Sequence, residues 1–147
     1  MESTPGSASS PGGGARRKAR KRALDLLFAS DLRSESAGDA LERAIAEGSA
    51  PTNAYTVTLV RGVVEHRARI DEVLGQYAQG WTLDRMPAVD RNVLRMGVFE
   101  LLWADDVPDA VAVSEAMALV RELSTDESPS FVNGVLGAIQ RSKSTLV

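Results

Sequence analysis

The sequence predicts an all-α fold, and three observations lead to this prediction. Apolar residues recur at spacings of three and four through most of the chain, which is typical of helices with one buried face. Ala, Leu and Val carry most of the apolar content, while aromatic residues make up only 5% of the 147 residues. No alternation of apolar and polar residues extends far enough to predict a sheet. A chain of this length is expected to form one domain, or two small subdomains that share a core.

The chain begins with a segment rich in Gly, Ser and Pro that has almost no apolar side chains to bury. This composition predicts a disordered tail over residues 1–14. A helical domain is expected over residues 15–142, followed by a flexible C-terminus over 143–147. The first helix is expected at about 16–33, where a run of cations leads directly into Leu24, Leu27 and Phe28.

Three more helices are expected before residue 80. One covers about 38–47 and ends at Gly48. The next covers about 54–66, with Thr52 or Asn53 as its N-cap, and its expected inward residues are Val57, Val60, Val63 and Val64. The last covers about 68–78 and is closed by Gly80, with inward residues Ile70, Val73, Leu74 and Tyr77.

The second half of the chain predicts three helices with clear breaks between them. Residues 81–86 form a short linker or a single turn, and Pro87 suits the first position of a helix that runs to about Trp103. The segment 105–108 is a stop signal, after which a helix covers about 109–123. Ser128 resembles an N-cap of the last helix, with Pro129 at the first helical position. The expected inward residues are Val89, Val93, Met96 and Phe99, then Val113, Ala116, Met117, Val120 and Leu123, and finally Phe131, Val132, Val135, Leu136 and Ile139.

This sequence lacks the residues that most kinds of catalytic and metal site need. There is no cysteine and only one histidine, His66, so thiolate metal sites, disulfides and nucleophilic relays are excluded. The acidic residues show no diagnostic spacing, and we expect no enzyme activity, no metal and no cofactor. No apolar run approaches the ~20 residues of a membrane span, and no signal peptide is present. A cytoplasmic protein without membrane contact is the simplest expectation.

Positive charge is concentrated at one end of the chain. Residues 1–22 carry a net charge of +5 and residues 23–147 carry −8. The cations are Arg16, Arg17, Lys18, Arg20, Lys21 and Arg22. One interpretation is a solvated arm or a processing signal. The other is a helical surface that binds a nucleic-acid backbone.

Helix geometry favours the second interpretation of the basic cluster. At ~100° per residue, Arg16 and Arg20 share an angular sector with Leu27, and Arg17 and Lys21 share one with Phe28. The charges therefore extend the core-facing side of the helix beyond the core, which predicts a rigid surface for a strand of phosphates. Sequence-specific binding needs base contacts as well, most simply with single-stranded RNA. Phe131 is a candidate for stacking on a base, although packing in the core is its alternative role.

Several segments of this chain, taken in order, are similar to the NusB family of bacterial transcription antitermination factors. They are the segment Trp81 to Met86, the segment Val89 to Leu102, the tripeptide Asp106-Val107-Pro108 with Val111 to Ala116, and the segment Phe131 to Leu136. Together with the Arg-rich first helix, they extend the resemblance over roughly residues 15–140. Ser114 departs from the pattern, because the family often has Asn there.

The resemblance implies an all-α fold of about seven helices in two packed bundles. It also implies binding of the boxA sequence of nascent ribosomal RNA leaders, jointly with NusE, a ribosomal protein, in a complex that joins RNA polymerase and suppresses termination. The RNA-binding residues would be the basic cluster at 16–22 with Glu127, Ser128 and Phe131. Phe28 and Asp90 would face NusE, with core packing and the helix N-terminus as their alternative roles. Some relatives form homodimers that cover the RNA surface, so both a monomer and a homodimer stay open.

Two other functions are alternatives to this one. The first is a helical protein-interaction module without specific RNA recognition, whose basic end binds an acidic partner. The second is an accessory part of an RNA methyltransferase, which the lack of a nucleophilic cysteine and of room for a cofactor fold argues against.

Overall fold

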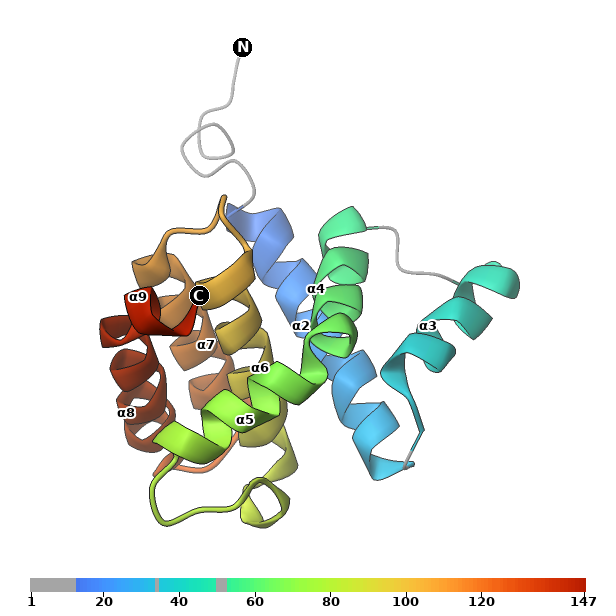
Figure 1. Ribbon diagram of the computed structural model, residues 1–147. Coiled ribbons are helices and arrows are strands. Elements are labelled where there is room, and N and C mark those ends of the chain that lie inside the picture. Colours follow the sequence, from blue (N-terminus) through green and yellow to red (C-terminus); the bar gives the residue numbers. More distant parts are fainter. Residues whose placement is uncertain (1–12, 34, 50–52) are drawn as a thin grey trace. The chain divides into compact units, whose positions relative to one another are not determined.

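The structure, a computed structural model, describes residues 13–33, 35–49 and 53–147. Within these ranges it contains eight α-helices, one 3-10 helix and no strand, which confirms the all-α class (Figure 1). The chain divides into two compact units, residues 1–61 and 62–147. The predicted tail lies outside the described residues as far as residue 12, and Gly13 and Gly14 begin the first described helix.

The first unit contains α2 (Gly13–Leu32), α3 (Ala37–Ala46) and most of α4 (Ala54–Glu65). Helix α3 begins after Ser36, whose hydroxyl accepts a hydrogen bond from the backbone N–H of Asp39 at 3.3 Å. It ends just before Gly48, which has a φ of 78° and so adopts the left-handed conformation that favours glycine. The helices predicted at 16–33 and 38–47 are therefore present, with small differences at their ends.

Helix α4 starts where the sequence indicates, but its buried face is rotated from the predicted one. The Asn53 side-chain oxygen accepts the backbone N–H of Tyr55 at 2.9 Å, so Asn53 caps the helix. The alternative cap, Thr52, lies outside the described residues. The prediction for Val64 was wrong, because its side chain is 38% exposed. The buried residues are Thr56, Leu59, Val60 and Val63, a stripe that leaves Val57 half-buried.

The second unit is built around α6 (Ala88–Trp103). Its other elements are α5 (Arg67–Tyr77), η1 (Leu83–Arg85), α7 (Asp109–Leu123), α8 (Ser128–Arg141) and α9 (Lys143–Leu146). Helix α6 contacts α5, α7, α8 and α9, and α8 also contacts α5 and α7 (Figure 1). The short helix α9 lies in the segment that was expected to be a flexible C-terminus. None of the described helices has the length and apolar composition to span a bilayer.

Helix α6 is buried on all its faces from Asn92 to Leu102, whereas the sequence predicted a single inward stripe. The stripe residues Val93, Met96 and Phe99 are buried as predicted, and Val89 is half-buried. Two polar residues of this segment, Asn92 and Arg95, have partners inside the unit. Asn92 donates to the backbone carbonyl of Ala88 at 2.9 Å, and Arg95 donates to both carboxylate oxygens of Asp71 at 2.9 and 3.2 Å.

The remaining helices follow the predicted pattern with three differences. Pro87 precedes α6 as its N-cap and is not its first helical residue. Leu123, predicted to point inward at the end of α7, is 38% exposed, and Val113 is half-buried. Ser128 is the first residue of α8 and not its N-cap, which is Glu127, and the Ser128 hydroxyl donates to the carboxylate of Asp90 at 2.8 Å.

Candidate nucleic-acid interface

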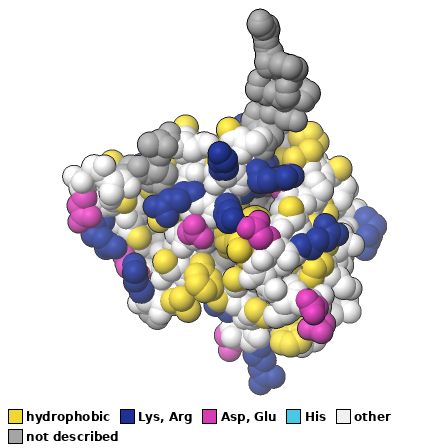
Figure 2. Space-filling model, turned by 180° about the vertical axis from the view of Figure 1, so that it is seen from behind, with side chains coloured by type: hydrophobic (Ala, Val, Ile, Leu, Met, Phe, Trp, Pro, Cys, Tyr) yellow, Lys and Arg dark blue, Asp and Glu magenta, His cyan; other side chains and the backbone are white. Residues whose placement is uncertain are grey.

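The basic cluster lies within the first three turns of α2, where its side chains have different environments. Arg17, Lys18, Lys21 and Arg22 are exposed. Arg16 is half-buried, and Arg20 is only 4% exposed. Figure 2 shows exposed Lys and Arg side chains, in dark blue, on the face of the molecule turned toward the viewer.

Arg20 lies on the buried face of α2 together with Ala23, Leu24 and Leu27. Its guanidinium carbon is 5.6 Å from the centre of the Tyr55 ring, and that of Arg16 is 4.1 Å from the same centre. Both distances are within the range of cation–π attraction. Arg20 therefore packs against Tyr55 and helps to hold α2 in place. It is not among the exposed cations that could contact RNA.

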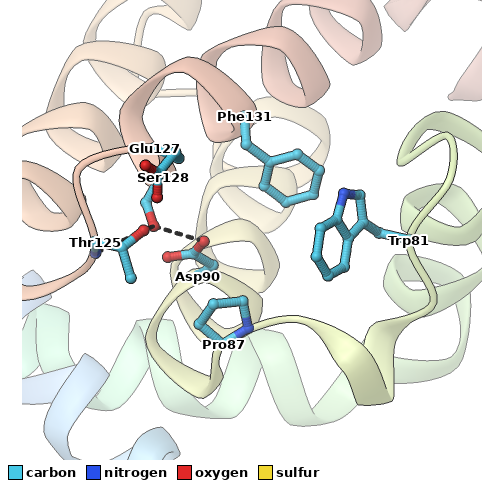
Figure 3. Close-up of a pocket in the computed structure, with 7 residues that line it drawn as sticks. All are labelled: Trp81, Pro87, Asp90, Thr125, Glu127, Ser128 and Phe131. Carbon is cyan, nitrogen blue, oxygen red and sulfur yellow. Dashed lines mark hydrogen bonds between the residues drawn. The ribbon is translucent and has the colours of Figure 1, made fainter.

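The other predicted RNA-binding residues line a pocket of about 360 Å³ in the second unit. Its walls come from the loop before η1, from the start of α6 and from the α7–α8 connection with the start of α8 (Figure 3). The lining residues are Trp81, Pro87, Asp90, Thr125, Glu127, Ser128 and Phe131. The structure therefore brings Glu127, Ser128 and Phe131 together with Asp90, which was predicted to face NusE.

Asp90 anchors one side of this pocket through hydrogen bonds to serine hydroxyls. Ser124 Oγ donates to one carboxylate oxygen at 2.6 Å, and Ser128 Oγ donates to the other at 2.8 Å (Figure 3). Ser128 Oγ also accepts the backbone N–H of Thr125 at 3.3 Å. Asp90 is 2% exposed, so its carboxylate serves to join the start of α6 to the loop before α8.

Two aromatic rings lie next to each other on one side of the pocket. The Trp81 and Phe131 ring centres are 6.1 Å apart, and their planes are inclined by 60° (Figure 3). Trp81 is 49% exposed, Phe131 is half-buried, and Glu127 is exposed at the same pocket. Trp81 belongs to one of the segments that carry the family resemblance, but it was not predicted to be a site residue. An aromatic residue in a loop rich in polar residues was the signal that pointed to it.

Phe28 lies in the first unit, in the C-terminal part of α2, and is half-buried. It follows Leu27, which is 4% exposed, so Phe28 lies at the edge of the buried stripe of α2. Both its predicted roles, packing and partner contact, are compatible with this position.

Other side-chain clusters point to packing instead of chemistry. His66 stacks on Trp103, with ring centres 4.0 Å apart and planes 11° from parallel, as expected for a structural aromatic contact. Across the part of the chain that the structure describes, no group of three His, Cys, Asp or Glu residues is placed to hold a metal ion.

Comparison with known proteins settles which family these features belong to. Residues 17–141 match the NusB family. The chain belongs to the NusB family. The family consists of transcription antitermination factors that are not enzymes, which confirms the class predicted from the sequence.

Relatives and solved structures of the family agree over nearly the whole chain. The transcription antitermination protein NusB of Nocardioides sp. is 76% identical over 132 residues, which span 90% of this chain and 98% of that relative. The structure of T. maritima NusB is 32% identical, with a TM-score of 0.76, and the match covers 86% of this chain and 90% of that one. A chain in a crystal structure of the antitermination factors NusB and NusE in complex with dsRNA is 30% identical, with a TM-score of 0.74, over 86% of this chain and 96% of that one.

Proposed function

We propose that this NusB-family chain binds boxA RNA of nascent ribosomal RNA leaders jointly with NusE, and so suppresses termination in the cytoplasm as part of an RNA polymerase complex. The observation that carries the proposal is the set of exposed cations on α2: Arg17, Lys18, Lys21 and Arg22. They lie on one short helical segment of a protein whose remaining residues are acidic overall. Nucleic acid would therefore be attracted to this segment and repelled elsewhere.

The cations and the pocket have different tasks in this proposal. Phosphate contacts from α2 supply affinity and salt dependence but little sequence choice. The pocket supplies base contacts, because an unstacked base can lie against the aromatic pair Trp81 and Phe131. The exposed carboxylate of Glu127 is an acceptor for the amino group of such a base. Pro87 and the Asp90–Ser128 pair shape the opposite wall.

Removal of charge from α2 tests the RNA-binding part of the proposal. The double variant Arg17→Gln, Lys21→Gln removes two exposed cations without touching the buried face of the helix. Each lost contact is expected to weaken binding of a single-stranded boxA oligonucleotide by about 1 kcal/mol and to flatten the salt slope by about 0.7–1. The measurement is a fluorescence anisotropy titration at several salt concentrations.

The matched control is the double variant Arg33→Gln, Arg121→Gln, which changes net charge equally at exposed residues outside the cluster. It should bind RNA almost as well as the natural chain, with an unchanged salt slope. If both double variants weaken binding equally, only net charge matters and the assignment to α2 fails. Unchanged binding in the Arg17, Lys21 variant would instead favour a helical protein-interaction module with an acidic partner. A duplex of the same sequence, run in parallel, separates single-stranded from double-stranded binding.

A further inference from the structure

The basic half of α2 consists mostly of good helix formers, but its charges oppose the helix. Arg16 and Arg20, Arg17 and Lys21, and Lys18 and Arg22 are like-charged pairs four residues apart, which repel each other on a helix surface. No acidic residue lies in the first turn, so these cations also oppose the positive end of the helix dipole. Two glycines start the helix and lower its propensity further. Contacts outside α2 that offset this repulsion therefore add to the order of this segment.

The start of α4 supplies such contacts on two successive turns of α2. Asn53 donates from its side-chain nitrogen to the backbone carbonyl of Ala15 at 3.0 Å. Thr56, which is fully buried, donates from its hydroxyl to the backbone carbonyl of Ala19 at 3.0 Å. Because Ala15 and Ala19 are one turn apart, the two bonds fix both the axis and the rotation of the helix at this end.

Tyr55 lies between these two residues in the sequence, and its ring meets the cations themselves. The guanidinium carbons of Arg16 and Arg20 are 4.1 and 5.6 Å from the ring centre, so one ring attracts two cations that repel each other. The same contact draws Arg16 and Arg20 toward the buried side of the helix. The other cations of the cluster are left facing solvent: Arg17, Lys18, Lys21 and Arg22.

We propose that Tyr55 is a positioning residue for RNA binding, supported by Asn53 and Thr56. It keeps residues 16–22 of α2 helical and sets which cations are presented to a phosphate backbone, without touching RNA itself. The inference rests on the proposed function, since it concerns the same basic helix, but it adds a residue of α4 that neither the sequence pattern nor the resemblance singled out.

Two substitutions of Tyr55 separate the ring's attraction for cations from its bulk. Tyr55→Phe keeps the aromatic face, whereas Tyr55→Leu keeps an apolar side chain without one. We expect the Leu variant to exchange its backbone amide protons at residues 16–22 roughly three- to tenfold faster in the absence of RNA, and to bind the boxA oligonucleotide three- to tenfold more weakly. The Phe variant should stay within about twofold of the natural chain in both measurements.

NMR-detected hydrogen exchange on the full chain resolves the individual amides, and those of α6 in the second unit serve as the internal reference. A purely structural role would change exchange throughout the protein and would not be rescued by Phe. If the Leu variant loses its fold, Asn53→Ser replaces it. This change removes the amide N–H that donates to Ala15 but keeps a side-chain oxygen to cap α4 at Tyr55, and the same local increase in exchange is expected.

The outcomes separate failure of this inference from failure of the proposed function. Unchanged exchange at 16–22 in the Leu variant would overturn the role of Tyr55, whether or not RNA binds. Faster exchange with unchanged RNA affinity would show that order in α2 is irrelevant to binding and would also overturn it. If the natural chain binds no boxA RNA, or if the Arg17, Lys21 variant binds normally, the proposed function fails, while the exchange data still test the contact with Tyr55.

Discussion

Arg17 and Arg20 are three residues apart in one helix, yet the side chain of Arg17 is exposed and that of Arg20 is buried, with only 4% of it exposed. Helical periodicity predicted part of this difference, because it placed Arg20 in the same sector as Leu27, which is also buried. The partner of Arg20 could not be predicted, since Tyr55 is far away in the sequence and no local spacing connects the two. A basic cluster read as one surface is therefore two sets of side chains with separate tasks.

Asp90 leads to a prediction at the same scale. Its carboxylate accepts hydroxyl hydrogen bonds at 2.6 and 2.8 Å while almost fully buried, and bonds to a charged acceptor are among the stronger ones in proteins. We expect Asp90→Ala to lower the free energy of unfolding by about 3 kcal/mol, and Asp90→Asn by about 1 kcal/mol, because Asn still pairs with one hydroxyl. Denaturant titration measures both values.

The control for this prediction is Asp126→Ala, which removes an exposed carboxylate from the loop before α8. It should change stability by less than about 0.5 kcal/mol. Equal stability of the Asp90→Ala and Asp126→Ala variants would contradict the structural role of Asp90. Contact with NusE, the other predicted role of Asp90, would then be favoured.

Among the elements of the second unit, α6 contacts four other helices, and substitutions of two glycines test how closely its surroundings pack. A Cβ atom on Gly62 in α4 would collide with the ring of Phe99 in α6, whereas one on Gly75 in α5 would meet open space. Gly62→Ala is expected to destabilise the protein by roughly 1–3 kcal/mol through overpacking. Gly75→Ala is expected to stabilise it by about 0.5–1 kcal/mol, because alanine favours a helix more than glycine does.

Thermal unfolding of the two variants, which carry the same chemical change, decides this prediction. Opposite shifts in Tm are expected. Shifts of the same sign would mean that the contact between Gly62 and Phe99 is looser than described, and that helix propensity alone determines both results.

Helix positions were predictable from the sequence, whereas contacts between helices were not. Local signals such as Gly48 and Asn53 placed several ends within one or two residues, because capping depends on neighbours in the chain. Helix α6 was predicted with one inward face, since periodicity cannot show that a helix is surrounded. Ser128 was predicted as a cap from the Ser-Pro pair alone. Its bond to Asp90 could not be predicted, because Asp90 is distant in the sequence and no local spacing connects the two residues.

For the molecule as a whole, the uneven charge explains why we assign affinity for RNA to the cations of α2 and sequence specificity to the aromatic pocket. The cations of α2 belong to the first unit and the aromatic pocket to the second, and each unit holds part of the residue set that the resemblance implied. The sequence located both parts but not the pocket itself, because Trp81, Asp90 and Phe131 are joined only by the fold. Binding that used α2 alone would be strong at low salt and nearly independent of sequence.

The most direct test of the account is the affinity of the full chain for a single-stranded boxA oligonucleotide, measured with and without NusE, beside a scrambled oligonucleotide of the same length. A joint mechanism predicts that NusE tightens boxA binding by about 5- to 150-fold and has little effect on the scrambled RNA. Equal affinities with and without NusE, or an equal gain for both RNAs, would contradict it and leave only the general attraction of a basic helix for nucleic acid.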